Sequence, residues 1–469
     1  MSVRAAEGVD FEATVPIAVV GAGAAGLIAA LAARDAGAEV VVFERDGSPS
    51  GSTALSSGLI PAAGTRFQRA KGIADSPELF AKDIQAKARG KADPAVVEAV
   101  ARAAAPTLEW LADRHGLEFV LLESFLYPGH SLLRMHAHPQ KTGAALMAAL
   151  LTAARDAGID VVTRAQASEL YADSQRRVRG LALLRPDGKV ERVGCSALVL
   201  ACNGFGGNKE MVRRYIPEMA DALYFGHPGN QGDAVRWGEA LGAATRHLGA
   251  YQGHGSVAEP HGILVTWAVM MEGGVQLNRW GRRFSNEHRG YSEQAVAVLS
   301  QPGKIAWNIF DGRCRAVARE FEDFREAEAA GAIKTAADVA ALAAVTGLAE
   351  DALTSTLADV TRYQRGEARD PYGRDFTAKP LLAPPFFAVR VTGALFHTQG
   401  GLAVDGRARV LSADGSPLPN LFAGGGAACG VSGPAVWGYL SGNGLLSAVT
   451  LGRLAGDAAA RLVLAPRAA

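Results

Sequence analysis

The chain begins with an apolar run that gives way to a glycine-rich turn and then to a helical pattern. Residues 16–20 (PIAVV) are apolar, GAGAAG follows at 21–26, and residues 27–37 repeat apolar side chains at a helical period. Residues 38–44 (AEVVVFE) have the composition of a second strand. The pattern predicts a strand–turn–helix–strand unit that opens a parallel sheet. Glycine interrupts the apolar stretch, which favours this interpretation over a membrane span.

Helix and strand patterns continue through the first half of the chain. We expect a helix at 145–158, a strand at 159–163 and a hairpin at 167–193 with Pro-Asp-Gly as its turn. A fully apolar strand follows from residue 196 and ends in the glycine-rich segment NGFGGN. These elements extend the same α/β pattern.

The middle of the chain, from about His254 to about Thr392, shows little alternation of strand and helix. It carries a hairpin-like segment at 273–287, with NRWG as its turn, and a helical run at 335–366. Strand patterns return at 398–425, and an apolar-faced helix at 443–462 closes the chain. The middle therefore has the character of an insertion.

The length supports a division into domains, because 469 residues are too many for one ordinary domain. We expect residues 1–252 and 393–469 to form the two parts of an α/β nucleotide-binding domain with a parallel sheet. Residues 253–392 would form an inserted α+β capping domain. With 49% hydrophobic and 20% charged residues, the chain can bury a large core and is not disordered.

Charge and cysteine content exclude several classes of partner. Lys plus Arg number 48 and Asp plus Glu number 47, so no net field attracts nucleic acid or an anionic membrane. The four cysteines are widely spaced and form no CxxC pair, which argues against a disulfide scaffold and against zinc or iron–sulfur sites. The first residues contain no apolar signal segment. We expect a cytoplasmic protein with no metal, no membrane anchor and no nucleic-acid partner.

The first turn has the features of a dinucleotide fingerprint. Gly21, Gly23 and Gly26 form GxGxxG between the first strand and the first helix, and Glu44 ends the second strand. In such a unit the glycines allow a tight turn, close approach of the pyrophosphate and close packing of helix on strand, while the acid binds ribose hydroxyls. The helix N-terminus favours the anionic phosphates. An ordinary tight turn would not explain Glu44.

These residues, together with later segments, resemble the fumarate reductase and 3-ketosteroid dehydrogenase superfamily of FAD flavoproteins. The resemblance covers nearly the whole chain and rests on GAGAAG with Glu44, SALVLACNGFGGN, GRRFSNE, HTQGGLAVD, LPNLFAGGG and GNGLLSAVTLGRLAG. It implies a Rossmann-like FAD-binding domain with an inserted cap, and a flavin N5 that exchanges hydride with a C–C bond. The FAD-linked segment has no histidine, so FAD is expected to be non-covalent. The residues expected to bind it are Gly21, Gly23, Ala25, Gly26, Glu44, Arg45, Ser52, Thr53, Ser57, Gly58, Ala167, Asn203, Gly204, Gly425, Gly442, Asn443, Leu445 and Leu446.

The sequence departs from the fumarate reductases at their arginines. Those enzymes carry an arginine proton donor five residues after the Glu of RFxNE, whereas Ser292 stands there and Tyr291 lies one residue earlier. The loop before the last helix, GVSGPAVWGYLSGN, also lacks the family's second arginine. A further difference is Gly426, which stands where the family often has a Glu that binds the ribityl chain.

Tyrosine near RFxNE and a GYxSG segment instead resemble the ketosteroid dehydrogenases, especially the Δ4-(5α) type. On that match Tyr291 polarises the substrate ketone or acts as an acid, and Tyr439 and Ser441 together take the α-proton. Removing hydrogen next to a carbonyl requires a base for the α-proton, donors for the enolate oxygen and a hydride acceptor. Neutral phenols suit a ketone in an apolar pocket, whereas arginines would suit a dicarboxylate.

Other side chains are weaker candidates. His254 and His397 fall where fumarate reductases place histidines that bind substrate carboxylate, although both could instead be satisfied by backbone carbonyls. Tyr127 resembles a tyrosine that ketosteroid dehydrogenases contribute, with an ordinary core tyrosine as the alternative, and Trp437 is expected to form a wall of the pocket. Glu287 and the nearby Arg289 are expected to form a surface salt bridge.

The leading hypothesis is an FAD-dependent α,β-desaturase of a small hydrophobic cyclic ketone, such as a 3-ketosteroid, a cyclohexanone or an oxocyclohexane carboxylate. Its electron acceptor is unknown. The first alternative is an enoate or enone reductase of the fumarate reductase type, which would work in the opposite direction. The second is a non-catalytic FAD electron-transfer subunit, in which the tyrosine and serine constellation would have no use.

Overall fold

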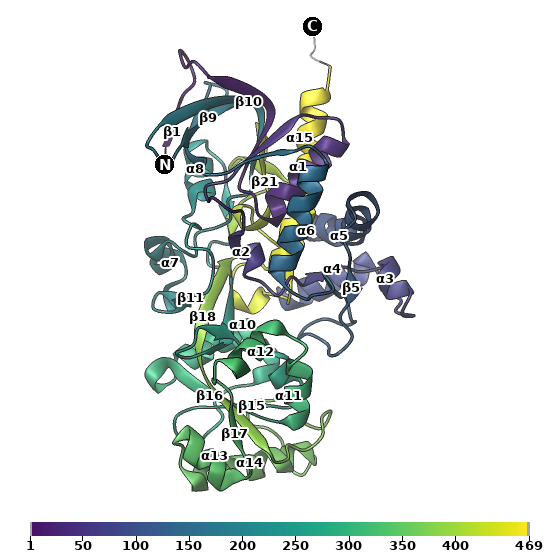
Figure 1. Cartoon of the computed structure of the whole chain (residues 1–469), viewed down its shortest axis with the longest axis vertical. Coiled ribbons are helices and arrows are strands. Elements are labelled where there is room, and N and C mark those ends of the chain that lie inside the picture. Colours follow the sequence, from purple (N-terminus) through teal and green to yellow (C-terminus); the bar gives the residue numbers. More distant parts are fainter. Residues whose placement is uncertain (1, 467–469) are drawn as a thin grey trace.

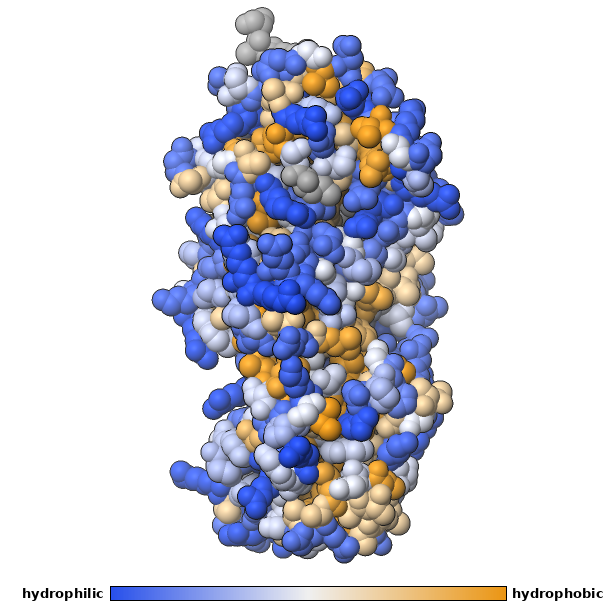
Figure 2. Space-filling model, turned by 90° about the vertical axis from the view of Figure 1, so that its left-hand side faces the viewer, coloured by the Kyte–Doolittle hydropathy of each residue, from blue (hydrophilic) through white to orange (hydrophobic). Residues whose placement is uncertain are grey.

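The computed structural model describes residues 2–466 and contains two large sheets. The molecule is elongated, with the chain termini at one end and the residues of the middle of the chain at the other (Figure 1). The space-filling view shows the same long outline, with polar residues over most of the face (Figure 2).

The first sheet has nine strands and carries the nucleotide-binding unit. Its order is β1-β8-β9-β10-β2-β3-β7, and β21 pairs with both β10 and β20. Strands β2, β3, β7, β10 and β21 are parallel, whereas β9 runs antiparallel to β8 and β10. The strand bounds are β1 Ser2–Ala5, β2 Ala13–Val20, β3 Val40–Phe43, β7 Asp160–Val162, β8 Gln166–Ala172, β9 Val178–Leu184, β10 Val190–Leu200, β20 Arg409–Leu411 and β21 Pro417–Ala423.

Helices cover this sheet, and two of them pack unusually closely. A Cβ on Gly452 or Gly456 of α15 would lie 2.5 Å or 2.1 Å from a carbonyl oxygen of α1, so both positions require glycine for this approach. The helix bounds in this part are α1 Ala24–Asp35, α2 Gly51–Ala54, α3 Arg66–Arg69, α4 Pro77–Lys87, α5 Pro94–His115, α6 Gly143–Asp156, α7 Lys209–Tyr215, α8 Asp233–Ala240 and α15 Asn443–Leu464.

The second sheet has seven strands around a long central strand, β18. Its order is β14-β13-β18-β16-β15, and β11 and β17 also pair with β18. The strand bounds are β11 Leu223–Tyr224, β13 Tyr251–Ala258, β14 Ile263–Leu264, β15 Val275–Leu277, β16 Ile305–Asp311, β17 Lys334–Ala336 and β18 Phe386–Thr398. The helices on this sheet are α9 Ala268–Met271, α10 Tyr291–Leu299, α11 Gly312–Ala318, α12 Glu322–Ala329, α13 Val339–Thr346 and α14 Glu350–Gln364.

Two small sheets complete the fold. One comprises β4 Ile60–Pro61, β5 Val120–Leu121 and β6 Met135–Ala137, and the other comprises β12 Thr245–Arg246 and β19 Gly401–Leu402. Short 3₁₀ turns occur at Pro217–Met219, Glu287–Arg289, Pro302–Lys304, Gly425–Ala427 and Val436–Gly438.

The α/β class and the opening strand–turn–helix–strand unit are confirmed, but one predicted hairpin is wrong. The turn after β15 forms, with Asn278 accepting the N–H of Trp280, yet the chain does not return as a second strand. Strand β15 pairs with β16 instead. The expected return strand contains Arg283, whose guanidinium hydrogen-bonds the carboxylates of Glu287 and Asp370. These contacts hold the segment as a loop and not as a strand.

Candidate active site

One cavity joins the glycine turn after β2 to the two candidate tyrosines. It is lined at one end by Gly21, Gly23 and Glu44, and at the other by Tyr291 and Tyr439. Its walls come from the carboxyl ends of the first sheet, the start of α15 and the second sheet. Ligands of open α/β sheets bind at such an edge. The fingerprint and the phenols therefore face the same space.

The three glycines of the fingerprint differ in what surrounds them. Gly21 has φ +104°, and a Cβ on it would lie 2.5 Å from the carbonyl oxygen of Ala201. A Cβ on Gly26 would lie 1.8 Å from the carbonyl oxygen of Gly21. At Gly23 the nearest atom to such a Cβ is Thr53 Oγ1 at 3.6 Å, so the cavity side is open. Gly21 and Gly26 serve the turn, and Gly23 leaves room for a phosphate.

The start of helix α1 is arranged to receive an anion. Gly23 is its N-cap and has no side chain to satisfy the first-turn amides. Thr53 Oγ1 accepts the N–H of Ala24 at 3.2 Å. Glu44 is 8% exposed and fixes the neighbouring turn, because its two oxygens accept the N–H groups of Ala22 and Asp46, each at 2.9 Å. The carboxylate still faces the cavity at the end of β3.

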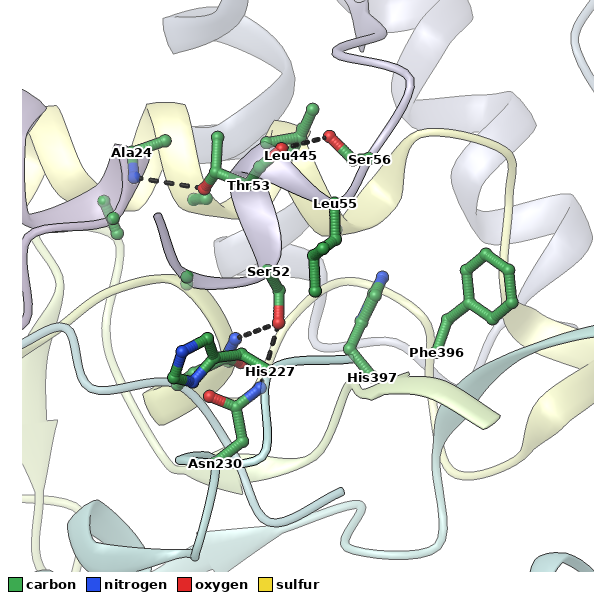
Figure 3. Close-up of a pocket in the computed structure, with 18 of the residues that line it drawn as sticks. Ala24, Ser52, Thr53, Leu55, Ser56, His227, Asn230, Phe396, His397 and Leu445 are labelled. Carbon is green, nitrogen blue, oxygen red and sulfur yellow. Dashed lines mark hydrogen bonds between the residues drawn. The ribbon is translucent and has the colours of Figure 1, made fainter. Parts of the chain in front are cut away.

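A polar loop, residues 226–230 (GHPGN), closes the cavity at the end near the fingerprint and was not predicted from the sequence. Ser52 Oγ accepts the amide N–H groups of Asn203 at 3.1 Å and of Asn230 at 2.9 Å (Figure 3). Arg45 Nη1 donates to the carbonyl of Gly229 at 3.0 Å, and His227 Nε2 lies 2.9 Å from Asp46. The signal available in the sequence was the short polar run GHPGN, which has no spacing rule that would have assigned it to the cavity.

Most of the residues expected at FAD line the cavity, and a minority support it from behind. The lining residues are Gly21, Gly23, Ala25, Glu44, Arg45, Ser52, Thr53, Ser57, Ala167, Asn203, Gly425, Gly442 and Leu445. The residues that lie behind the lining are Gly26, Gly58, Gly204, Asn443 and Leu446.

Those behind the lining have structural contacts of their own. A Cβ on Gly58 would lie 2.8 Å from the carbonyl oxygen of Thr142, and one on Gly204 would lie 1.8 Å from Thr398 Oγ1. Asn443 Nδ2 donates to Ser432 Oγ at 3.0 Å, and Leu446 is fully buried in the core. The open face of Gly23, and an N-cap without a side chain at the start of α1, fit the pyrophosphate of FAD.

Helix α15 begins at the far end of the cavity beside Tyr439. Its N-cap, Gly442, has φ +86°, and Gly444 and Leu445 line the cavity. The N–H of Gly444 donates to the Tyr439 hydroxyl at 3.4 Å. The positive end of the helix dipole would favour negative charge at this place.

The structure brings Tyr291, Tyr439 and Ser441 together. Their exposures are 7%, 5% and 4%, and the two phenol rings lie 6.1 Å apart between centroids. Burial raises the pKa of Tyr291 to about 12, although the hydroxyls of Ser441 and Tyr439 act in the opposite direction. Burial, reinforced by Tyr291, raises the pKa of Tyr439 well above its usual value of about 10. Both phenols are therefore neutral near pH 7.

An aromatic wall stands beside the phenols. The His254 ring stacks on Tyr291 at 4.8 Å and on Phe396 at 5.3 Å, and Trp267 meets it edge-on at 5.6 Å. Tyr127 also lines the cavity and packs on Phe125 at 4.5 Å. Trp267 and Phe396 were not predicted from the sequence, because neither belongs to a motif.

The two histidines line the cavity as neutral rings. Burial lowers the pKa of His254 to about 3 and that of His397 to about 4. His254 Nδ1 accepts the N–H of Ser256 at 3.2 Å, so its proton is on Nε2. His397 Nδ1 lies 3.0 Å from Gln399 Nε2 and 3.4 Å from the carbonyl oxygen of Thr398. Backbone contacts therefore exist beside both rings, and both rings also face the cavity (Figure 3 shows His397).

None of the described residues that line the cavity end beside Tyr291 and Tyr439 is an Arg or Lys. Among the described residues that line the cavity, Arg45 is the one Arg or Lys, and it lies at the fingerprint end. The groups at the other end are phenols, neutral imidazoles, hydroxyls and apolar side chains. This composition suits an uncharged oxygen better than a dicarboxylate.

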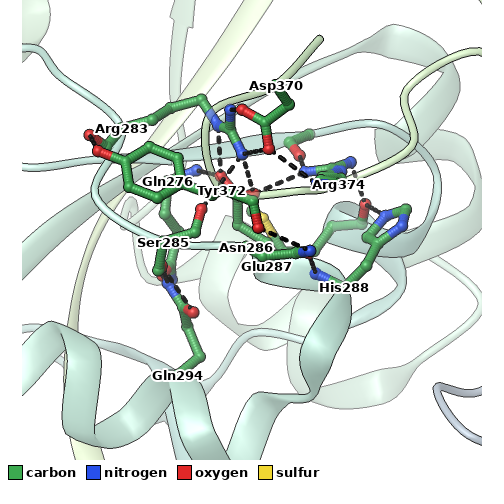
Figure 4. A network of polar contacts seen from close by, with 12 residues as sticks. Gln276, Arg283, Ser285, Asn286, Glu287, His288, Gln294, Asp370, Tyr372 and Arg374 are labelled. Atoms are coloured by element: carbon green, nitrogen blue, oxygen red, sulfur yellow. Dashed lines mark hydrogen bonds and ion pairs between the residues drawn. The ribbon is translucent and has the colours of Figure 1, made fainter.

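Two expectations about side chains are corrected. Trp437 does not line the cavity, because its ring is covered by the Arg89 guanidinium, whose carbon lies 4.3 Å from the ring centroid. Glu287 is fully buried and forms no surface pair with Arg289. It accepts hydrogen bonds from Arg283 and Arg374, which draw it into the interior of the second sheet (Figure 4).

Residues 2–466 contain neither a candidate metal cluster nor a candidate membrane span. No group of three or more His, Cys, Asp or Glu side chains in this range could hold a metal ion. None of the helices described is sufficiently long and apolar to traverse a bilayer.

Comparison with known proteins identifies the family. The model of the family described as FAD binding domain matches residues 17–445. A probable fumarate reductase of Shewanella frigidimarina is 31% identical over 453 residues, covering 96% of this chain and 76% of the relative. A 4-oxocyclohexanecarboxylate 2-dehydrogenase of Sinomonas cyclohexanicum is 26% identical over 505 residues, covering 87% of each.

A solved structure has the same fold. The 3-ketosteroid-Δ4-(5α)-dehydrogenase of Rhodococcus jostii RHA1 superposes with a TM-score of 0.75 at 24% identity, covering 97% of this chain and 99% of that one. Together with the geometry of the fingerprint, the family match and the fumarate reductase relative show that the chain belongs to the FAD binding domain family and is an FAD-dependent oxidoreductase related to fumarate reductases.

Proposed function

We propose that the protein desaturates a cyclic ketone next to its carbonyl group. The observation that carries the proposal is the group of Tyr291, Tyr439 and Ser441, buried together at the end of the cavity where no cation stands. When bound, FAD supplies the acceptor for the hydride that leaves the β-carbon. The names of two similar proteins, one a dehydrogenase of an oxocyclohexane carboxylate and one of a 3-ketosteroid, agree with a cyclic ketone.

The side chains divide the remaining work. Tyr291 is a neutral donor and would hydrogen-bond the ketone oxygen as enolate charge develops. Tyr439 would take the α-proton as the phenolate, which the Gly444 N–H and the start of α15 stabilise. Because the pKa of Tyr439 is raised, the reactive phenolate is scarce near pH 7. The rate of flavin reduction is therefore expected to increase with pH through the alkaline range.

An enoate reductase of the fumarate reductase type is the second candidate. The 31% identical relative favours it, and the same groups could work in reverse. The missing arginines argue against a dicarboxylate substrate, because two carboxylates would enter a neutral cavity without counter-charge. A non-catalytic electron-transfer subunit would leave the buried phenols and Ser441 without a role.

Anaerobic mixing of the FAD-loaded protein with ketones separates these candidates. Bleaching of the flavin by cyclohexanones, 4-oxocyclohexane carboxylate or saturated 3-ketosteroids supports desaturation. Reoxidation of the dithionite-reduced protein by fumarate or an enone, without bleaching by ketones, would favour reduction. No reaction in either direction would favour the subunit.

Variants test the roles of the phenols. Tyr291→Phe and Tyr439→Phe are each expected to bind FAD normally and to slow flavin reduction by at least 100-fold. Tyr363→Phe is the matched control, since this tyrosine lies on α14 away from the cavity. Near-normal reduction rates in both active-site variants would remove the mechanism.

A further inference from the structure

The three residues at the end of helix α4 contact both segments that carry the phenols. Lys87, the last residue of α4, donates from Nζ to the carbonyl of Arg289 at 2.8 Å and forms an ion pair with Glu293. Arg289 lies two residues before Tyr291, and Glu293 lies two residues after it. Lys87 therefore holds the chain on both sides of Tyr291.

The other phenol segment is held by the residues that follow Lys87. The Arg89 guanidinium covers the ring of Trp437, two residues before Tyr439, with 4.3 Å between the guanidinium carbon and the ring centroid. Ala88 is fully buried, and its Cα lies 3.5 Å from where a Cβ of Gly438 would stand. This contact gives Trp437 a role outside the cavity.

The Lys87–Glu293 pair is largely removed from water. The side chains are 13% and 23% exposed, and Glu293 Oε2 is buried without a hydrogen-bond partner. Gly290 makes the arrangement possible, because it has φ +143° and a Cβ there would lie 2.6 Å from Glu293 Oε2. Loss of Lys87 would remove both the ion pair and the donor to the Arg289 carbonyl that hold the start of α10.

The contact between Lys87 of α4 and the start of α10 also joins the parts of the molecule that carry the first and the second sheet. Helix α4 packs on α5 beside the first sheet, whereas α10 packs on β13 and β18 of the second sheet. In Figure 1, α10 lies at the junction between the two sheets. Tyr291 stands at the start of α10 and Tyr439 follows the turn Val436–Gly438, and residues 87–89 contact both segments.

We propose that residues 87–89 set the placement of Tyr291 relative to Tyr439, with Lys87 as the main positioning residue. The expected effect of Lys87 on the reaction rate rests on the proposed function, whereas its expected effect on the position of Tyr291 does not. Displacement of a positioned group by about 1 Å can reduce a rate about 100-fold, so the reaction should depend on Lys87 although Lys87 does not line the cavity.

The first experiment measures placement without any substrate. The FAD-loaded protein is labelled with 3-fluorotyrosine, and the ¹⁹F signals of Tyr291 and Tyr439 are assigned with the two Tyr→Phe variants. Lys87→Met is expected to shift or broaden the Tyr291 signal, and Lys87→Arg is expected to restore it. If Lys87→Met does not fold, Lys87→Gln replaces it, because glutamine retains a donor for the Arg289 carbonyl but not the charge.

Lys141→Met is the matched control. Lys141 Nζ forms an ion pair with Glu320 at 3.0 Å. This pair joins the loop before α6, beside the first sheet, to the segment after α11, beside the second sheet, and it involves neither phenol segment. Its loss should leave both ¹⁹F signals unchanged. Unchanged Tyr291 and Tyr439 signals in Lys87→Met, or equal changes in Lys141→Met, would overturn the proposal.

The second experiment measures turnover with a ketone that bleaches the wild-type flavin. Lys87→Met should lower kcat at least tenfold, with KM changed less than threefold and FAD affinity unchanged, whereas Lys141→Met should remain within twofold. Equal kcat in the two variants would contradict the role of Lys87. If the wild type reacts with no ketone, the proposed function fails and the ¹⁹F result alone decides the placement.

Discussion

The buried network around Glu287 predicts a large and local loss of stability in Glu287→Gln. Glu287 is fully buried and accepts from Arg283 Nε at 2.9 Å and Nη2 at 2.7 Å, and from Arg374 Nη1 at 3.1 Å. Asp370 is the remaining carboxylate of the network, and it pairs with Arg283 (Figure 4). Removal of one charge from such a buried group costs about 3–5 kcal/mol, because the arginines lose their counter-charge.

The pKa of Glu287 gives a second value for the contribution of its charge to the free energy of unfolding. Burial opposes ionisation, but Arg283 and Arg374 outweigh it and lower the pKa from 4.5 to about 2. That difference corresponds to about 3 kcal/mol of stability. Because the folded-state pKa is the lower one, the contribution is complete above about pH 5 and is lost as the pH falls towards 2. Glutamine does not titrate and should abolish this pH dependence.

Hydrogen exchange measured by mass spectrometry can locate the effect. Peptides of β15, β16 and β18 should lose protection equivalent to about 3 kcal/mol in Glu287→Gln, while those of the first sheet should change little. Glu259→Gln is the control, because the Glu259–Arg390 pair is 35% and 41% exposed and should contribute less than about 1 kcal/mol. Equal losses in the two variants, or an acid-dependent loss that persists in Glu287→Gln, would refute the reasoning.

Three further predictions concern the cavity. Gly23→Ala should fold normally but weaken FAD binding at least tenfold, because its Cβ would enter the cavity. Gly26→Ala should prevent folding, because its Cβ would collide with the Gly21 carbonyl. Thermal unfolding and titration of FAD fluorescence distinguish the two outcomes. His254 and His397, whose pKa values are lowered to about 3 and about 4, should remain neutral from pH 8 down to pH 5.5, and a histidine ¹⁵N signal of either residue that titrates near pH 6.5 would contradict this. His397→Ala should raise KM for an acidic ketone far more than for a neutral one if the ring binds a carboxylate, and equal changes would exclude that contact.

The parts of the site that could be predicted from the sequence are those where chemistry follows local spacing. The turn from Gly21 to Gly26 and the distance to Glu44 define a strand–turn–helix–strand unit within one stretch of chain, and the structure places that unit as expected. The positions of Tyr291 and Tyr439 came from short motifs of the family. Their common place at one cavity depends on how two sheets pack, which no local pattern contains.

The errors came from side-chain contacts that no motif describes. The exposed pair expected for Glu287 is replaced by Arg283, four residues earlier, and by Arg374, which lies 87 residues further on. Trp437 lies only two residues before Tyr439, yet its ring packs against the Arg89 guanidinium and does not line the cavity. Side-chain direction in such loops is decided by partners brought in through tertiary structure, so proximity in sequence to a candidate catalytic residue was a poor guide.

Strand β18 has a consequence for how this chain can change over evolutionary time. Its 13 residues run through the centre of the second sheet, and its last residues bring Phe396 and His397 to the cavity and Thr398 against Phe205. Phe396 lies at a register shift against β13, between the pairs Gln252–His397 and Gly253–Leu395, and this irregularity lets two successive residues line the cavity. Before this shift successive residues point to opposite faces, so inserting or deleting one residue there would turn each side chain to the other face. The segment between α12 and α13 contains β17, which pairs with β18, but the loop between α13 and α14 lies outside the sheet. We therefore expect length differences among homologues to collect there, while the count of residues along β18 stays the same.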